Sequence, residues 1–189
     1  MTELKYGDRV HLQNGYNAWA GGYLDTNNHS TETGGKYRVS TTATPTRGQS
    51  TGTWEILSAT GQAAGQPVVS GDLIHLRNLY GGDGGYLDTN NHASAAQKTA
   101  GAKYDVSTSA ARDRAPGTGR WRIFAQTSSP GDQNIRLGDV ILLWNTYGDN
   151  GGFLETNNVS TETNALYDVC TNAYFNRSSD VTFWKTIKA

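Results

Sequence analysis

"GGYLDTNNHSTET" (residues 21–33), "GGYLDTNNHASAA" (84–96) and "GGFLETNNVSTET" (151–163) are three near-copies of one motif. The aromatic third residue recurs after 63 positions from Tyr23 to Tyr86, and after 67 positions from Tyr86 to Phe153. So regular a spacing indicates an internal structural repeat whose loops carry insertions. The chain is therefore expected to consist of three related units.

The repeat extends well beyond the motif on both sides. The other recurring residues are Gly7, Gly71 and Gly138; Asp8, Asp72 and Asp139; Asn14, Asn78 and Asn145; Tyr16, Tyr80 and Tyr147; Tyr37, Tyr104 and Tyr167; and Trp54, Trp121 and Trp184. Both linkers from a tryptophan to the next Gly-Asp pair span 17 residues, so neither suggests a domain boundary. We expect a single domain over residues 1–189, with repeats of roughly 7–70, 71–137 and 138–189.

Each unit contains four short segments typical of β-strands, separated by glycine, asparagine or serine. In the first unit these segments are roughly residues 9–14, 22–26, 36–41 and 53–57. Val10 and Leu12 alternate with polar residues, which is the period of a half-buried strand. No stretch has a helical apolar stripe, so almost no helix is expected. Twelve short strands in three four-strand repeats predict an all-β fold, a β-trefoil with pseudo-threefold symmetry.

Composition excludes several classes of function. Sixteen basic and seventeen acidic side chains give a net charge of −1, which provides no general attraction for nucleic acid or an anionic membrane. No apolar stretch approaches the roughly 20 residues of a membrane-spanning helix. Neither nucleic-acid binding nor membrane insertion is expected.

The single cysteine and the first ten residues of the sequence indicate the cellular location of the protein. Cys170 is the only cysteine and has no intrachain disulfide partner, and "MTELKYGDRV" lacks the pattern of a signal peptide. The expectation is a cytoplasmic protein, or one secreted without a signal peptide.

Catalysis and metal binding find no support in the motifs. The acidic residues recur once per unit rather than as one convergent pair, and no nucleophile motif is present, so the protein is not expected to be an enzyme. His11 and His75, like His29 and His92, share repeat positions that the third unit fills with Leu142 and Val159. No metal or other cofactor is expected.

The "GGYLDTNN…W" pattern resembles the repeat of β-trefoil lectins related to the ricin B chain, over most of the chain. In that family an aspartate at this position accepts hydrogen bonds from sugar hydroxyls, so the resemblance nominates Asp25 and Asp88, with Glu155 in the third unit. The chain departs from the family at two kinds of position. Gly52, Gly119 and Thr182 stand where the family has glutamine, and Ser40, Ser107 and Cys170 lie near the position of its aromatic platform.

Each motif also offers a chemically complete sugar site. A carboxylate accepts hydrogen bonds, amides donate and accept them, and an aromatic ring packs against the C–H face of a sugar. The candidate residues are Asp25, Asn27, Asn28 and Tyr16; Asp88, Asn90, Asn91 and Tyr80; Glu155, Asn157, Asn158 and Tyr147; and Trp19 in the first unit only. The alternative is that the asparagines merely close a hairpin.

The predicted function is therefore a lectin with two or three equivalent sites that binds clustered glycans or glycoconjugates by multivalency, as a monomer or small homo-oligomer. The alternative is a protein-binding module such as a Kunitz-type protease inhibitor, acting through the loop "TPTRGQSTG" or "SAARDRAPG".

An arginine stands seven residues before each repeated tryptophan, at Arg47, Arg114 and Arg177. A guanidinium can hold several backbone carbonyls of a loop, or pair with the aspartate of the Gly-Asp turn. The competing interpretation places it beside the carboxylate of the "LDTNN" motif, where it donates to sugar oxygens. For these arginines, the structural role in holding the loop is favoured over the sugar-binding role.

Overall fold

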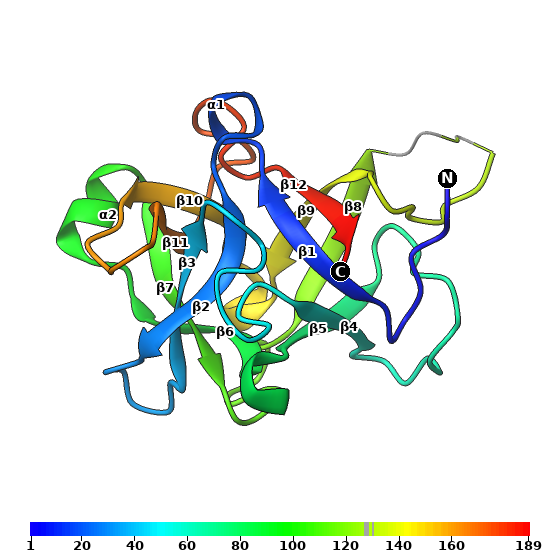
Figure 1. Cartoon of the computed structure of the whole chain (residues 1–189), viewed down its shortest axis with the longest axis horizontal. Helices are drawn as coiled ribbons and strands as arrows, with labels where there is room; N and C mark the ends of the chain where they lie inside the picture. Colours follow the sequence, from blue (N-terminus) through cyan, green and yellow to red (C-terminus); the bar gives the residue numbers. More distant parts are fainter. Residues whose placement is uncertain (127–128, 130) are drawn as a thin grey trace.

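The structure, a computed structural model, describes residues 1–126, 129 and 131–189; residues 127, 128 and 130, in the second predicted repeat, lie outside the described residues. The described residues form twelve strands (Figure 1). In chain order these are β1 Arg9–Asn14, β2 Tyr23–His29, β3 Tyr37–Thr42, β4 Trp54–Ser58, β5 Leu73–Asn78, β6 Gly85–His92, β7 Ala102–Ser109, β8 Trp121–Gln126, β9 Val140–Asn145, β10 Gly152–Val159, β11 Tyr167–Asn172 and β12 Trp184–Lys188.

Helical structure is confined to short turns. These are α1 Tyr16–Trp19, the 3-10 turns η1 Tyr80–Gly82 and η2 Tyr147–Asp149, and α2 Ala95–Thr99. The predicted all-β class is confirmed, and the four segments expected in the first unit correspond to β1–β4. No helix in the described part of the chain is long and apolar enough to span a membrane.

All twelve strands belong to one antiparallel sheet, and three of its long ladders, β1–β12, β4–β5 and β8–β9, join different repeats. β1 pairs with β12 from Val10↔Lys188 to Asn14↔Trp184, but with its own neighbour β2 only at Gln13↔Tyr23. β4 likewise pairs with β5 of the next repeat from Trp54↔Asn78 to Ser58↔Ile74. Three hairpins, β2–β3, β6–β7 and β10–β11, complete the sheet.

This pairing corrects the predicted fold, a β-trefoil of three four-strand repeats. Ten strands follow one another in a closed ring in the order β11, β3, β2, β1, β12, β9, β8, β5, β6 and β7, with β7 pairing back to β11; β4 and β10 pair onto this ring. The result is a closed antiparallel β-barrel. The sequence repeat is therefore not the pairing unit, because the open edges of each unit's strands find their partners in neighbouring units.

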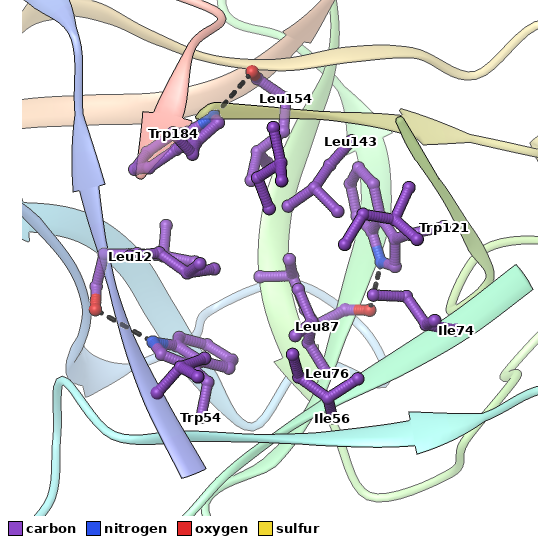
Figure 2. Close-up of a cluster of buried hydrophobic side chains, with 14 of the residues drawn as sticks. Leu12, Trp54, Ile56, Ile74, Leu76, Leu87, Trp121, Leu143, Leu154 and Trp184 are labelled. Carbon is purple, nitrogen blue, oxygen red and sulfur yellow. Dashed lines mark hydrogen bonds between the residues drawn. The ribbon is translucent and has the colours of Figure 1, made fainter. Parts of the chain in front are cut away.

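The core contains the three repeated tryptophans, each fully buried. Trp121 Nε1 donates to the Leu87 carbonyl at 2.9 Å, and Trp184 Nε1 donates to the Leu154 carbonyl at 3.0 Å (Figure 2). Trp54 makes the same bond to Leu24 at 2.8 Å. Each indole thus fills the core and satisfies its single polar atom within the "YLD" or "FLE" stretch of its own repeat.

The repeated asparagine before each tyrosine joins neighbouring repeats. Asn78 is fully buried; its Nδ2 donates to the Thr51 carbonyl at 2.7 Å, and its Oδ1 accepts from Tyr80 N at 3.0 Å. The Thr26 hydroxyl, from the motif of the preceding repeat, donates to the same Oδ1 at 3.1 Å. Asn145 and Asn14 make the equivalent bonds, so every repeat is tied to the next by one buried amide.

The double glycine that opens each motif follows from this amide. A Cβ on Gly84 would overlap the Asn78 side chain, and Gly85 has a φ of +91°, which L side chains rarely adopt. The same close approach recurs at Gly21 and Gly151. The glycines are therefore steric requirements of the contact between asparagine and motif.

The tryptophan hydrogen bond can be tested by Trp121→Phe. The substitution leaves the Leu87 carbonyl unpaired in the core and a void beside it, so we expect a loss of about 2 kcal/mol in the free energy of unfolding, measured by denaturant titration. Phe124→Leu, at a partly exposed side chain of the same strand, is the control and should change stability by less than about 0.5 kcal/mol. Equal effects of the two substitutions would contradict the assigned role.

Candidate functional site

The carboxylate of each motif is fully buried and paired with the repeated arginine. Asp25 Oδ1 lies 2.6 Å from Arg47 Nη2, and Arg47 Nη2 also donates to the Thr26 carbonyl at 2.8 Å. Arg114 joins Asp88 at 3.2 Å and the Thr89 carbonyl at 3.1 Å, and Arg177 joins Glu155 at 3.1 Å and the Thr156 carbonyl at 3.3 Å. The arginines thus hold both the motif carboxylate and a backbone carbonyl.

This arrangement leaves the carboxylates away from the surface on which a sugar would lie. Burial raises the pKa of Asp25 and of Asp88 above its usual range, while the neighbouring arginine opposes part of the rise. The aspartates of the Gly-Asp turns do not pair with these arginines; Asp8, Asp72 and Asp139 each accept the backbone N–H of the residue three positions earlier, at 2.8 Å. Each arginine side chain remains partly exposed at its outer edge.

The paired asparagines follow the buried part of the motif, where the strand register shifts between Thr26 and His29. Asn28 Nδ2 donates to Glu162 Oε2 at 2.6 Å, and Asn91 Nδ2 donates to Glu32 Oε2 at 2.8 Å. Both contacts cross to the loop of another repeat. The second repeat has Ala95 at the corresponding position, in α2, so Asn158 has no equivalent glutamate to contact.

The predicted tyrosines group differently from the expectation. Tyr80 packs edge-on against Tyr37 of the preceding repeat, with ring centroids 5.4 Å apart, and Tyr147 packs against Tyr104 at 5.5 Å. Tyr16, predicted to accompany Asp25, instead lies 5.2 Å from Tyr167 of the third repeat. Each tyrosine therefore belongs with the asparagines of the repeat before its own.

Trp19 lies in a tight loop whose three residues Asn17, Ala18 and Trp19 all have positive φ. The Lys185 ammonium lies 4.0 Å from the Trp19 ring centroid. One face of the indole is thus occupied by a cation within the chain, and the predicted stacking surface is only partly available.

Two equivalent surface grooves result. The first groove, about 470 Å³, is lined among others by Asn27, Asn28, His29, Tyr37, Arg47 and Tyr80. The second groove, about 490 Å³, is lined among others by Asn90, Asn91, His92, Tyr104, Arg114 and Tyr147. Each combines amides, a guanidinium edge and aromatic rings. Two adjacent repeats line the first groove, whereas Glu32 and Thr33 of the first repeat also line the second.

The sequence analysis missed one pair of residues in each groove. His29 stacks on Tyr37 with centroids 5.0 Å apart, and His92 stacks on Tyr104 at 5.5 Å. The signal in the sequence was that these histidines and tyrosines recur at equivalent positions of the repeat. The histidines, however, lie just beyond the second expected strand, and the tyrosines lie within the third, so the sequence did not suggest that they meet. Val159 replaces the histidine in the third repeat and is exposed. Within the described residues, no cluster of three or more histidine, cysteine or acidic side chains has the geometry of a metal site.

The buried ion pair can be tested by Asp88→Ala. Removing the carboxylate leaves Arg114 without its partner and a void beneath it, so the free energy of unfolding should fall by about 2–3 kcal/mol in denaturant titrations. Asp83→Ala removes a mostly exposed carboxylate and is the matched control, with an expected change under about 0.5 kcal/mol. Unchanged stability of Asp88→Ala would return this aspartate to the list of ligand-binding groups.

No family model matches the chain, and no curated protein matches it. The resemblance to ricin B-type lectins thus has no support from sequence families. Solved structures do match. The SDF2-like protein from Arabidopsis thaliana has a TM-score of 0.71 at 16% identity, covering 98% of this chain and 94% of that chain.

Two other solved structures match over 98% of this chain. A Caenorhabditis elegans protein of unknown function has a TM-score of 0.70 at 16% identity, with 96% of that chain covered. The S. cerevisiae protein O-mannosyltransferase Pmt1-Pmt2 complex bound to the sugar donor has a TM-score of 0.72 at 16% identity, with 25% of that chain covered. At these identities the likeness establishes the β-rich fold that the chain shares with them.

Proposed function

We propose that the chain is a non-catalytic carbohydrate-binding protein that takes one glycan end in each of its two grooves. The observation that carries this proposal is the recurrence of one set of side chains in both grooves: two asparagines, a histidine stacked on a tyrosine, an arginine edge and a second tyrosine. Asn28 and Asn91 are exposed, whereas Asn27 is half-buried and Asn90 is buried. The surface that both grooves keep is thus one exposed amide, the histidine–tyrosine pair, the arginine edge and the second tyrosine, and its recurrence favours recognition of the same ligand twice.

The chemistry of the grooves suits a neutral sugar. Amides both donate and accept hydrogen bonds, as a sugar hydroxyl does, and a partly exposed guanidinium adds donors at a fixed angle. The tyrosine and histidine rings offer faces to the C–H side of a pyranose. The groove volumes fall in the range of small-ligand pockets. The buried carboxylates contribute indirectly, by fixing the arginines.

The structural neighbours are compatible with this ligand class but do not select it. One neighbour belongs to a mannosyltransferase complex bound to its sugar donor, whereas another, with a TM-score of 0.60 at 11% identity, is described as a type II water-soluble chlorophyll-binding protein. A fold that serves such different ligands does not define function, so the proposal rests on the groove residues. Two sites on one molecule would strengthen binding to clustered glycans by avidity.

The protease-inhibitor alternative has weaker support. Its two candidate loops contain Arg47 and Arg114, and both guanidinium groups are held by buried carboxylates. An inhibitory loop needs an exposed side chain that can enter a protease pocket. These two arginines point toward the motif of their own repeat. Arg112, in the second loop, is exposed and donates to the Tyr86 hydroxyl at 3.2 Å, so it is the one arginine of these loops that meets this requirement.

A glycan array followed by calorimetric titration with the best sugar tests the proposal. We expect two equivalent sites in the unmodified protein. His92→Ala should weaken one of them about fivefold, because it removes one ring of the stacked pair, worth about 1 kcal/mol. His29→Ala should weaken the other to a similar degree.

The third repeat supplies the matched control. Val159→Ala changes the corresponding exposed position and should leave both sites and their affinities unchanged. The proposal fails if no glycan binds at millimolar concentration, or if Val159→Ala weakens binding as much as the histidine substitutions do.

A further inference from the structure

A further cavity of about 330 Å³ lies where the three hairpins meet, next to the second groove. The second strands of the hairpins pair with one another there, at Asp168↔Ser40, Arg38↔Ser107 and Cys170↔Asp105. All three repeats contribute to its lining. The exposed residues Thr31, His92, Ser94 and Thr161 line its outer part, and buried residues such as Ser40 and Gln97 line its inner part.

The charge of this junction cavity is strongly unbalanced. Four carboxylates, Glu32, Asp105, Glu162 and Asp168, line it together with one guanidinium, Arg38. Arg38 pairs with Glu162. Within the described residues, no lysine or arginine lies within ion-pair distance of Asp105 or Asp168.

The protein environment compensates these two aspartates only in part. The Val106 N–H donates to Asp105, and the Ser160 hydroxyl donates to Asp168. Arg38 lies near enough to both to oppose part of the rise in pKa. Burial, with Glu32 and Asp168 nearby, raises the pKa of Asp105 to about 6. Burial is also the main reason that the pKa of Asp168 is raised, with Glu162 adding to it. Carboxylates kept in such a position at a cost to stability are typical of ligand sites.

Ser40 provides an independent sign of a missing partner. It is 2% exposed, it lines the junction cavity, and its hydroxyl has no hydrogen-bond partner. Side chains two residues apart on a strand, and those directly opposite in an antiparallel pair, share a face. Ser40 therefore lies on the face that carries Arg38 and Asp168. The β2–β3 pairing also places Asp25 opposite Ser40 on this face, and Asp25 Oδ2 likewise has no hydrogen-bond partner. Its counterpart Ser107 accepts a bond from Asn90 at 3.2 Å, so Ser40 differs from its equivalent.

We propose that the junction cavity binds a small organic cation that carries both a primary ammonium group and hydroxyl groups, such as an amino polyol or amino sugar. The ammonium would lie between Asp105 and Asp168, and a hydroxyl of the ligand would pair with Ser40. A cavity of about 330 Å³ holds roughly ten waters at about 30 Å³ each, and so a molecule with about ten non-hydrogen atoms.

A metal ion does not fit this set of residues. The acidic side chains come from three separate repeats, and no three of the described histidine, cysteine or acidic residues form a group that could hold a metal. Two carboxylates without an ion-pair partner and one unpaired hydroxyl instead match a ligand with separate cationic and hydroxyl groups. The junction cavity adjoins the second groove, because Glu32 and His92 line both. Its proposed ligand contacts, Ser40, Asp105 and Asp168, line the cavity and not that groove, so the proposal does not depend on the ligand of the grooves.

Calorimetry with the amino polyol glucamine at pH 7.5 tests the site, with sorbitol and n-butylamine as comparisons. Glucamine should bind at least tenfold more tightly than either, because sorbitol lacks the ammonium and butylamine lacks the hydroxyls. Asp105→Asn should weaken glucamine about tenfold, and Ser40→Ala should weaken it less. Asp83→Asn, on an exposed carboxylate outside the cavity, should have no effect. Equal affinities for glucamine and sorbitol, or unaltered binding by Asp105→Asn, would overturn the proposal.

The pH dependence gives a second readout. Glu32, Arg38, His92, Glu162 and Asp168 also face the cavity, but the pKa of Asp105 is about 6, so its protonation at pH 5 should lower the affinity for glucamine about tenfold relative to pH 7.5. His92→Ala should keep this dependence and Asp105→Asn should lose most of it. The opposite pattern would contradict the assignment to Asp105.

The thermal stability of Asp105→Asn shows whether the variant is folded and whether the Asp105 carboxylate destabilises the folded state. The pKa of Asp105 is higher in the folded chain, at about 6, than the ordinary value of 3.8, so the folded state holds its proton more tightly and loses stability as the pH rises between these values. Asp105→Asn should therefore be more stable than the parent at pH 7.5 and little different at pH 4. Thermal melts at both pH values measure this, and lower stability at pH 7.5 would show that the carboxylate serves the fold.

Discussion

The structure depends on a buried amide that no repeat can satisfy alone. Asn14, Asn78 and Asn145 are fully buried, and each bonds to backbone carbonyls and to a threonine hydroxyl of another repeat. An unpaired amide in this position would cost more than a single hydrogen bond contributes, so the three repeats must assemble together. The glycines that open each motif make room for this amide. The strand ladders between repeats and the grooves built from more than one repeat likewise form only when the repeats assemble.

Much of the local structure follows from the sequence. The alternation around Val10 and Leu12, the spacing of the tryptophans and the Gly-Asp turns indicate strands, core and turns correctly, because local geometry and burial determine them. The grouping of strands does not follow. A repeat in sequence says which residues are equivalent, but not whether β4 completes its own unit or pairs with β5 of the next one.

In the candidate site, too, the sequence identifies the residues but not how they are grouped. The carboxylate, the asparagines and the arginine are repeated residues, and the sequence finds them all, but it cannot separate a buried ion pair from an exposed ligand group. Asp25 and Arg47 stabilise the groove wall, whereas His29 and Tyr37 form part of its surface. Tyr80 reaches the first groove from the next repeat, and such a partnership between repeats becomes visible only in three dimensions.

The pairing of β1 with β12 bears on how this chain could be rearranged. These two strands join the first and the third repeat in one ladder, as β4 with β5 and β8 with β9 join the other neighbouring repeats (Figure 1). The three repeats are therefore joined by three comparable ladders that form a ring. A circular permutant of residues 1–189, with residue 189 joined to residue 1 and the chain opened in the linker between β4 and β5, would preserve every pairing between the named strands.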